Sequence, residues 1–226
     1  SRAFRRSAVR SPLGCHDPTR LEAERLSAES LDRSLDEALA GRAAGAPLWL
    51  FAYGSLMWNP GFAFVAKRVA TIYGFHRDFC LWSRINRGTF ERPGLVLSLE
   101  RGGSCRGIAF RLSESTSREE LRKLWRREMS LGSYHPRWLE CHAGPDRFPV
   151  LAFIANPHCS GYAGRLPVEE MVQSLATARG KFGSSAEYLF QTQAALESHG
   201  IRDERVRRLA ERVRAHFARV ASPSRG

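Results

Sequence analysis

The sequence predicts an α+β fold: a mostly antiparallel sheet, open or closed, with helices before, between and after its strands. Short apolar segments of strand length occupy the centre of the chain, and Gly-rich or charged turns separate them. A helical spacing of apolar residues precedes these segments, interrupts them once and fills the C-terminal third. Consecutive short strands joined by hairpin-like turns favour antiparallel pairing.

The first predicted helix spans residues 27–41. Ser27 is a suitable N-cap, and Gly41 can end the helix. Between them, Leu31, Leu35 and Leu39 recur at every fourth position, as on the buried face of an amphipathic helix.

The strands follow from residue 48 onward. The predicted strands are residues 48–53, 69–75, 77–83, 94–99, 105–112, 137–142 and 148–154. Turns at residues 86–88 and 101–103 separate some of them. The predicted C-terminal helices are residues 167–179, 184–199 and 203–220.

One further helix, residues 117–131, interrupts the strands. Ser117 and Glu120 have the spacing of a capping box, and Gly132 can end the helix.

The totals describe an ordinary globular protein with a basic excess. The chain has 226 residues, of which 43% are hydrophobic and 26% charged, and no apolar run approaches the length of a membrane span. The net charge is +12, but residues 1–20 carry +4 of it and residues 201–226 carry +5. Because the excess lies at the two ends, a solvated tail or helix face explains it, and we do not expect a nucleic-acid partner.

The five cysteines are scattered and form no C-x-x-C pair. This pattern predicts reduced thiols in the cytoplasm rather than a zinc site. The first residues lack the apolar core of a secretory signal.

Glu128 breaks the pattern of its predicted helix. On a helical wheel it falls in the middle of the apolar arc formed by Leu121, Leu124, Trp125 and Met129. Breaks of this kind tend to mark function. Burial would raise the pKa of the carboxyl group, and a carboxyl group titrating near neutrality can accept a proton and return it.

The wheel leaves other interpretations of Glu128 open. Arg126 and Arg127 point away from the apolar arc. An arginine or backbone N–H groups could satisfy a purely structural buried carboxylate, or the last turn of the helix could reach solvent.

The segment after the first strand is a candidate binding loop. Gly54 permits close approach of a ligand, and successive N–H groups in such a turn can hold an anion. Ser55 adds a hydroxyl, and residues 57–60 add an apolar, aromatic wall. A simple tight turn between strands remains the alternative. Outside this segment, the motifs of serine hydrolases, P-loop proteins, zinc proteases and dinucleotide-binding folds do not occur.

Five segments, in the same order, resemble the signatures of the ChaC-type glutathione-specific γ-glutamylcyclotransferase family. They are residues 53–60, 74–79, 127–134, 183–189 and 200–203. The resemblance covers roughly residues 27–217 and implies a small mixed β-barrel with surrounding helices. Two departures are Ala52, where the family usually has Gly, and Ser185, where Asn is frequent.

The resemblance also implies an activity and a site. Members act on glutathione and release 5-oxoproline and cysteinylglycine, without a metal or cofactor, and Glu128 matches their catalytic glutamate. The implied substrate-binding residues are Ala52, Tyr53, Gly54, Ser55, Leu56, Met57, Arg77, Tyr134 and Tyr188. Arg77 is a candidate for a substrate carboxylate, or else a surface arginine, and the two last tyrosines could equally be packing residues.

The expected organisation is a flexible basic segment over residues 1–26, one domain over residues 27–220 and a short tail over residues 221–226. Glutathione is the expected partner, and the sequence does not define the oligomeric state. The alternatives are a cyclotransferase for another γ-glutamyl amine or peptide, and a non-catalytic regulatory protein of the same fold.

Overall fold

The structure is a computed structural model that describes residues 25–43, 45–116 and 118–222. The expectations for residues 1–24, for Ser117 as a cap and for the last four residues lie outside this part. In chain order the elements are α2 (Ala28–Ala40), β1 (Trp49–Ala52), the 3-10 turn η2 (Ser55–Met57), β2 (Phe64–Ser83), β3 (Gly94–Leu112), α3 (Arg118–Met129), β4 (Tyr134–Ala143), β5 (Asp146–Ala155), α4 (Val168–Thr177), β6 (Arg179–Gly180), β7 (Gly183–Ser184), α5 (Ser185–Ser198) and α6 (Glu204–Ala221).

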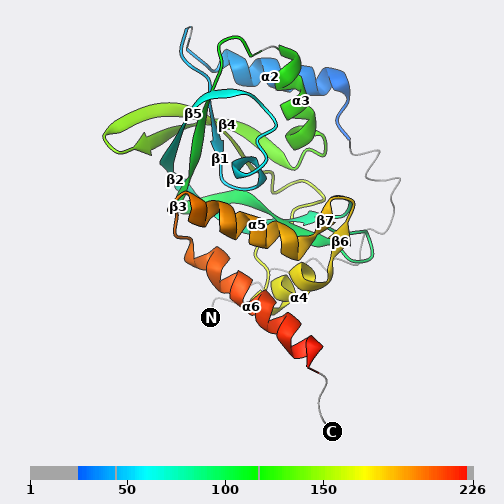
Figure 1. The fold of residues 1–226 in the computed structure, drawn as a ribbon. Helices are drawn as coiled ribbons and strands as arrows, with labels where there is room; N and C mark the ends of the chain where they lie inside the picture. The colour runs from blue at the N-terminus through cyan, green and yellow to red at the C-terminus, as the bar shows by residue number, and fades with distance from the viewer. Residues whose placement is uncertain (1–24, 44, 117, 223–226) are drawn as a thin grey trace, which may run out of the picture.

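The long strands close into a barrel in the order β1-β3-β2-β4-β5 (Figure 1). Every pairing in it is antiparallel except that of β1 with β5, which is parallel and closes the barrel. The prediction of a mixed, mostly antiparallel barrel with surrounding helices is confirmed. Buried side chains from all five strands belong to one hydrophobic core, among them Leu50, Ile72, Leu97, Cys141 and Phe153.

Two pairs of predicted strands are single long strands in the structure. Residues 69–75 and 77–83 both belong to β2, and residues 94–99 and 105–112 both belong to β3. The predicted turn at residues 101–103 is wrong. Gly102 and Gly103 have positive φ, as does Gly74 opposite them, so both strands bulge where the register shifts and the ladder continues on either side.

The helices cover the barrel from opposite sides (Figure 1). On one side, α2 packs against α3, and the ion pairs of Arg118 with Asp36 and of Arg122 with Asp32 join them. The predicted cap of α2 is confirmed, because the Ser27 side chain accepts a hydrogen bond from the N–H of Ser30.

On the other side, α5 lies against β3 and η2, with α4 and α6 packed beside it. A capping box of Ser184 and Glu187 starts α5, and the Asp203 side chain caps α6. This arrangement brings α5 to the loop that follows β1, where it can contribute side chains to a site.

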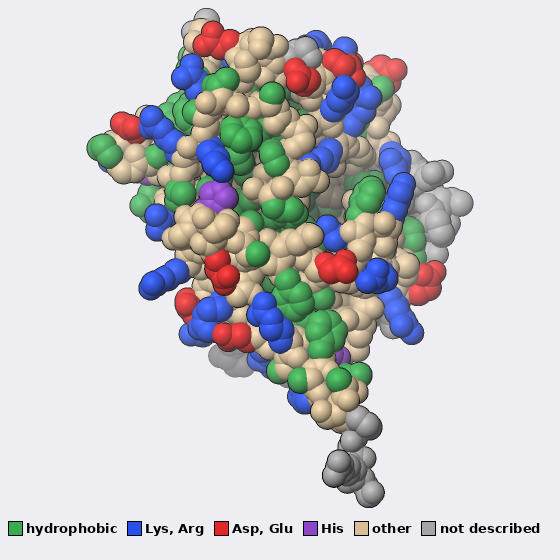
Figure 2. All heavy atoms as spheres, in the orientation of Figure 1, with side chains coloured by type: hydrophobic (Ala, Val, Ile, Leu, Met, Phe, Trp, Pro, Cys, Tyr) green, Lys and Arg blue, Asp and Glu red, His purple; other side chains and the backbone are tan. Residues whose placement is uncertain are grey.

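The surface carries both signs of charge. On the face drawn in Figure 2, arginines and lysines are spread over the molecule with acids among them, and do not gather into one stripe. Each helix of the described residues falls short of the length and apolar character needed to cross a membrane.

Candidate active site

The loop after β1 lies under α5. Gly54 precedes η2, and its carbonyl accepts a hydrogen bond from the N–H of Met57 at 2.9 Å. A Cβ atom added to Gly54 would lie 3.1 Å from the Tyr188 hydroxyl and 3.7 Å from the Leu97 Cβ. Because glycine has no side chain, Tyr188 of α5 and Leu97 of β3 can lie close to the loop backbone here.

Glu128 reaches this loop from the last turn of α3. Its side chain is 12% exposed. The apolar residues beside it, Leu124, Trp125 and Met129, are buried, so Glu128 lies on the buried face of the helix as the helical wheel predicts. Oε1 lies 3.0 Å from Nε of Arg127, an ion pair whose angles do not meet the criteria of a hydrogen bond, so this oxygen has no hydrogen-bond partner. Burial raises the pKa of Glu128, and the Arg127 guanidinium partly lowers it.

A small cavity of about 20 Å³ joins the loop to Glu128, with room for about one water molecule. Its lining residues are Tyr53, Gly54, Ser55, Leu56, Leu97, Glu128, Tyr134, Phe153 and Tyr188. Most of the predicted site residues thus meet around one space, although they come from three distant parts of the chain, residues 53–56, 128–134 and 188. Ala52, Met57 and Arg77 are not in the lining, and Leu97 and Phe153 are lining residues that the sequence did not indicate.

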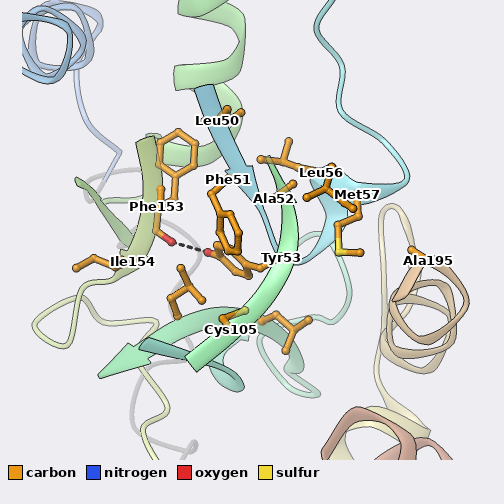
Figure 3. Close-up of a cluster of buried hydrophobic side chains, with 14 of the residues drawn as sticks. Leu50, Phe51, Ala52, Tyr53, Leu56, Met57, Cys105, Phe153, Ile154 and Ala195 are labelled. Carbon is orange, nitrogen blue, oxygen red and sulfur yellow. Dashed lines mark hydrogen bonds between the residues drawn. The ribbon is translucent and has the colours of Figure 1, made fainter. Parts of the chain in front are cut away.

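Three tyrosines form the polar part of the wall. The Tyr53 hydroxyl donates to the Phe153 carbonyl oxygen at 2.6 Å, and the dashed line in Figure 3 joins these two atoms. The Tyr134 hydroxyl contacts the Leu97 carbonyl oxygen at 3.3 Å, and the Tyr188 hydroxyl accepts from the Leu97 N–H at 3.4 Å.

Burial raises the pKa of each of these tyrosines: well above the usual value for Tyr53 and Tyr134, and to about 12 for Tyr188. All three are therefore neutral near pH 7 and can offer polar contacts without changing charge. Among the lining residues, Glu128 is the one carboxylic acid, and its raised pKa favours exchange of a proton with a bound ligand.

Arg77 is neither on the surface nor in the cavity lining. It is 4% exposed, and its guanidinium donates to the Tyr53 carbonyl oxygen at 2.6 Å and the Arg106 carbonyl oxygen at 2.7 Å, and pairs with Asp203. The surface interpretation is wrong. Three of the five N–H donors of the guanidinium contact the loop backbone at Tyr53, the Arg106 carbonyl oxygen and Asp203, so Arg77 ties the loop to its neighbours.

Two other arginines approach the site without having been predicted. Arg127 spans from Glu128 to the loop, although the helical wheel points it outward. The wheel gives the direction of the Cβ atom, and a long side chain can fold back from it. Only the adjacency of Arg127 and Glu128 in the chain could have signalled the contact.

Arg87 is the second, in the connection between β2 and β3. Its guanidinium lies 5.5 Å from the ring centroid of Tyr188, a lining residue. Burial lowers the pKa of Arg87, while Tyr188 and the carboxylate of Glu187 nearby raise it, and Nη1 donates to the Ser184 carbonyl oxygen at 3.5 Å. A half-buried cation next to the cavity is suited to hold an anionic part of a ligand.

Cysteine nucleophiles, a second cavity and metal sites have weaker support in this structure than the site at Glu128. Cys80, Cys105 and Cys141 are buried, and burial raises the pKa of each thiol, to about 11 for Cys105 and about 12 for Cys141. They are therefore poor nucleophiles. A larger cavity of about 790 Å³ lies between α2 and α3, but neither Glu128 nor the Gly54 loop lines it. Within the described ranges, no cluster of three or more His, Cys, Asp or Glu is arranged for a metal.

The sequence is similar to those of known enzymes over most of its length. The glutathione-specific γ-glutamylcyclotransferase of Escherichia coli strain K12 is 38% identical over 179 residues, which cover 79% of this chain and 78% of that protein. The glutathione-specific γ-glutamylcyclotransferase 1 of Mus musculus is 34% identical over 149 residues, 64% of this chain and 67% of that protein.

The fold is also similar to a solved structure. A crystal structure of the γ-glutamylcyclotransferase specific to glutathione from yeast superposes with a TM-score of 0.70 at 20% identity, over 76% of this chain and 97% of that one. The model of the ChaC-like protein family matches residues 48–216. This chain therefore belongs to the ChaC-like family.

Proposed function

We propose that this protein is a glutathione-specific γ-glutamylcyclotransferase, a lyase that converts glutathione into 5-oxoproline and cysteinylglycine. The observation that carries the proposal is the buried carboxylate of Glu128, which faces the Gly54 loop across a small cavity. The similarity to curated enzymes of this name over most of the chain supports the substrate.

In the proposed reaction the α-amine of the γ-glutamyl group attacks the side-chain amide carbonyl of the same residue. The new C–N bond closes a five-membered ring, and the bond to the cysteine nitrogen breaks. Glu128 accepts the proton that the amine loses and delivers a proton to the departing nitrogen, so protons balance over one turnover. Nucleophile and electrophile belong to one molecule, and the site has to hold the folded-back conformer.

The walls of the cavity supply hydrogen-bond donors for the carbonyl oxygen, which becomes negative during the reaction. N–H groups that open a helical turn have no partner within the helix, and η2 begins in this loop at Ser55. These groups, and the hydroxyl of Tyr188, which accepts from the Leu97 N–H and keeps its own proton, are donors that can stabilise the negative charge. A γ-glutamyl group exceeds about 20 Å³, so side chains of the wall must move when it binds.

We further propose that the reaction takes place in the cytoplasm. Cys80, Cys105 and Cys141 are free thiols, as is usual in a reducing compartment.

The decisive assay follows 5-oxoproline release from glutathione and, at equal concentrations, from γ-glutamylalanine and a γ-glutamylamine. We expect kcat/KM for glutathione to exceed the others by at least about tenfold, since the second peptide bond and carboxylate of glutathione add contacts worth about 1.4 kcal/mol or more. A preference for either other substrate would assign the chain a different γ-glutamyl compound. Absence of 5-oxoproline from all three would instead favour a non-catalytic protein.

Arg87 should contribute to this selectivity. We expect Arg87→Met to raise KM for glutathione about tenfold or more, because the variant loses a charge-assisted hydrogen bond to the glycine carboxylate. The test compares glutathione with its C-terminal carboxamide. Wild type should prefer the acid and Arg87→Met should not, whereas Arg92→Met, an exposed change in the same connection, should behave as wild type. An unchanged preference in Arg87→Met would assign the glycine carboxylate to another residue.

A further inference from the structure

The Arg127 side chain connects the carboxylate of Glu128 to the loop after β1. Nε lies 3.0 Å from Glu128 Oε1, Nη2 donates to Ser55 Oγ at 3.1 Å, and Nη1 donates to the Asn59 carbonyl oxygen at 2.6 Å. One guanidinium thus contacts α3 and both ends of the turn around η2.

These contacts set Arg127 apart from an ordinary surface arginine. Arg126 precedes it on the same helix and pairs only with Glu119, and both of those side chains are more than half exposed. The Arg127 side chain is 31% exposed, and a Cβ atom added to Gly61 would lie 3.2 Å from its Nη1. The chain after η2 therefore leaves room for this side chain to lie along the loop.

We propose that Arg127 is the positioning residue of the site: it fixes Glu128 against the Gly54 loop and favours the ionised carboxylate that must accept the substrate's proton. The proposal rests on the proposed function and adds a residue to it. Ser55 and Asn59 hold the guanidinium in one orientation, and the guanidinium in turn limits where the Glu128 carboxylate can lie.

The surroundings of Glu128 make Arg127 its dominant charged neighbour. From the loop after β1, from β4 and from α5, the groups that face it are Tyr53, Tyr134 and Tyr188, all neutral near pH 7. Burial raises the pKa of Glu128, and Arg127 is the charge that lowers it. Loss of that positive charge should move the pKa of Glu128 further upward, because a nearby opposite charge favours the ionised form of a carboxylate.

The expected effect appears in the pH profile of kcat/KM. A general base works only when it is ionised, so activity rises with pH through the pKa of Glu128 in the free enzyme. Arg127→Met should move this acidic limb to higher pH by about 1 to 3, the range that an opposite charge within 4–6 Å produces. Arg127→Lys keeps the charge and should leave the limb within about 0.5 of wild type. It should nevertheless lower kcat, because an ammonium group cannot contact the three partners together.

The experiment measures 5-oxoproline release from glutathione between pH 5 and 9 for wild type, Arg127→Met, Arg127→Lys and the control Arg126→Met. The control removes a positive charge from the same helix without touching Glu128, so its limb should coincide with that of wild type. A merely structural role of Arg127 would lower activity at every pH and leave the limb where it is.

A folded, active Arg127→Met protein with the wild-type limb would overturn the proposal. If Arg127→Met does not fold, Arg127→Gln is measured in its place, and the same unshifted limb contradicts the proposal. Failure of the proposed function looks different, because wild type itself would then release no 5-oxoproline.

Discussion

Glu128→Gln should lower kcat/KM for glutathione by at least about a hundredfold, the lower end of what general acid–base catalysis contributes. Glutamine keeps the shape of the side chain and its place in the cavity wall, but it cannot accept the proton of the attacking amine. The loss should appear in kcat, because the amide still fits the cavity in which the substrate binds. Release of 5-oxoproline under saturating glutathione measures it.

The same variant should fold at least as stably as wild type near neutral pH. Burial raises the pKa of Glu128 above its value in the unfolded chain, so this group destabilises the folded protein as pH rises through the interval between the two values. An uncharged amide removes that dependence. Thermal unfolding of Glu128→Gln and of the exposed control Glu119→Gln separates lost chemistry from lost structure. A folded glutamine variant with wild-type turnover would exclude Glu128 as the base.

Arg77→Leu should lower the free energy of unfolding by about 3–5 kcal/mol, the usual cost of removing one partner of a buried ion pair. The change leaves Asp203 without its cation, and it leaves the carbonyl oxygens of Tyr53 and Arg106 without their donor. The Arg77 side chain is 2% exposed and that of Asp203 19%, so solvent can replace little of what is lost. Urea unfolding at neutral pH measures the difference.

Arg212→Met is the matched control for Arg77→Leu. Arg212 also belongs to the C-terminal region, on α6, and pairs with Glu169 of α4, but the two side chains are 51% and 76% exposed. Exposed pairs contribute about 0–1 kcal/mol, so this change should cost no more than that. If Arg77→Leu cost no more than Arg212→Met, the buried pair would not be what holds the C-terminal helix and the loop together.

Local sequence patterns predicted most helices and strands. Features that depend on contacts between distant parts of the chain, such as bulges and buried ion pairs, were not predicted. The N-cap of α2 and the leucines at every fourth position are local signals, and both appear in the structure as expected. The bulge in β3 is not local, because Gly102 and Gly103 resemble a turn between strands until the opposite strand is known to bulge at Gly74. The helical wheel gives the direction of each Cβ atom. It therefore predicted that Glu128 faces the core, but it did not predict the contacts of Arg127, which depend on the conformation of a long side chain.

Arg77 shows the limit more sharply. The register of β2 shifts near Gly74 and again near Cys80, so a simple alternation along the strand does not tell which side chains face inward. Its partner Asp203 lies 126 residues later, at the start of α6, which packs against α4 and α5. No spacing in the sequence announces a pair of this kind.

The narrow space beside Glu128 also bears on the choice between two reactions. Hydrolysis and ring closure compete for the same carbonyl carbon and differ in the attacking atom, a water oxygen in one case and the substrate's own nitrogen in the other. The space of about 20 Å³ has room for about one water molecule, so a γ-glutamyl group that enters it must displace that water. We therefore expect the substrate's own amine to be the nucleophile beside Glu128, and the product to be a lactam rather than free glutamate.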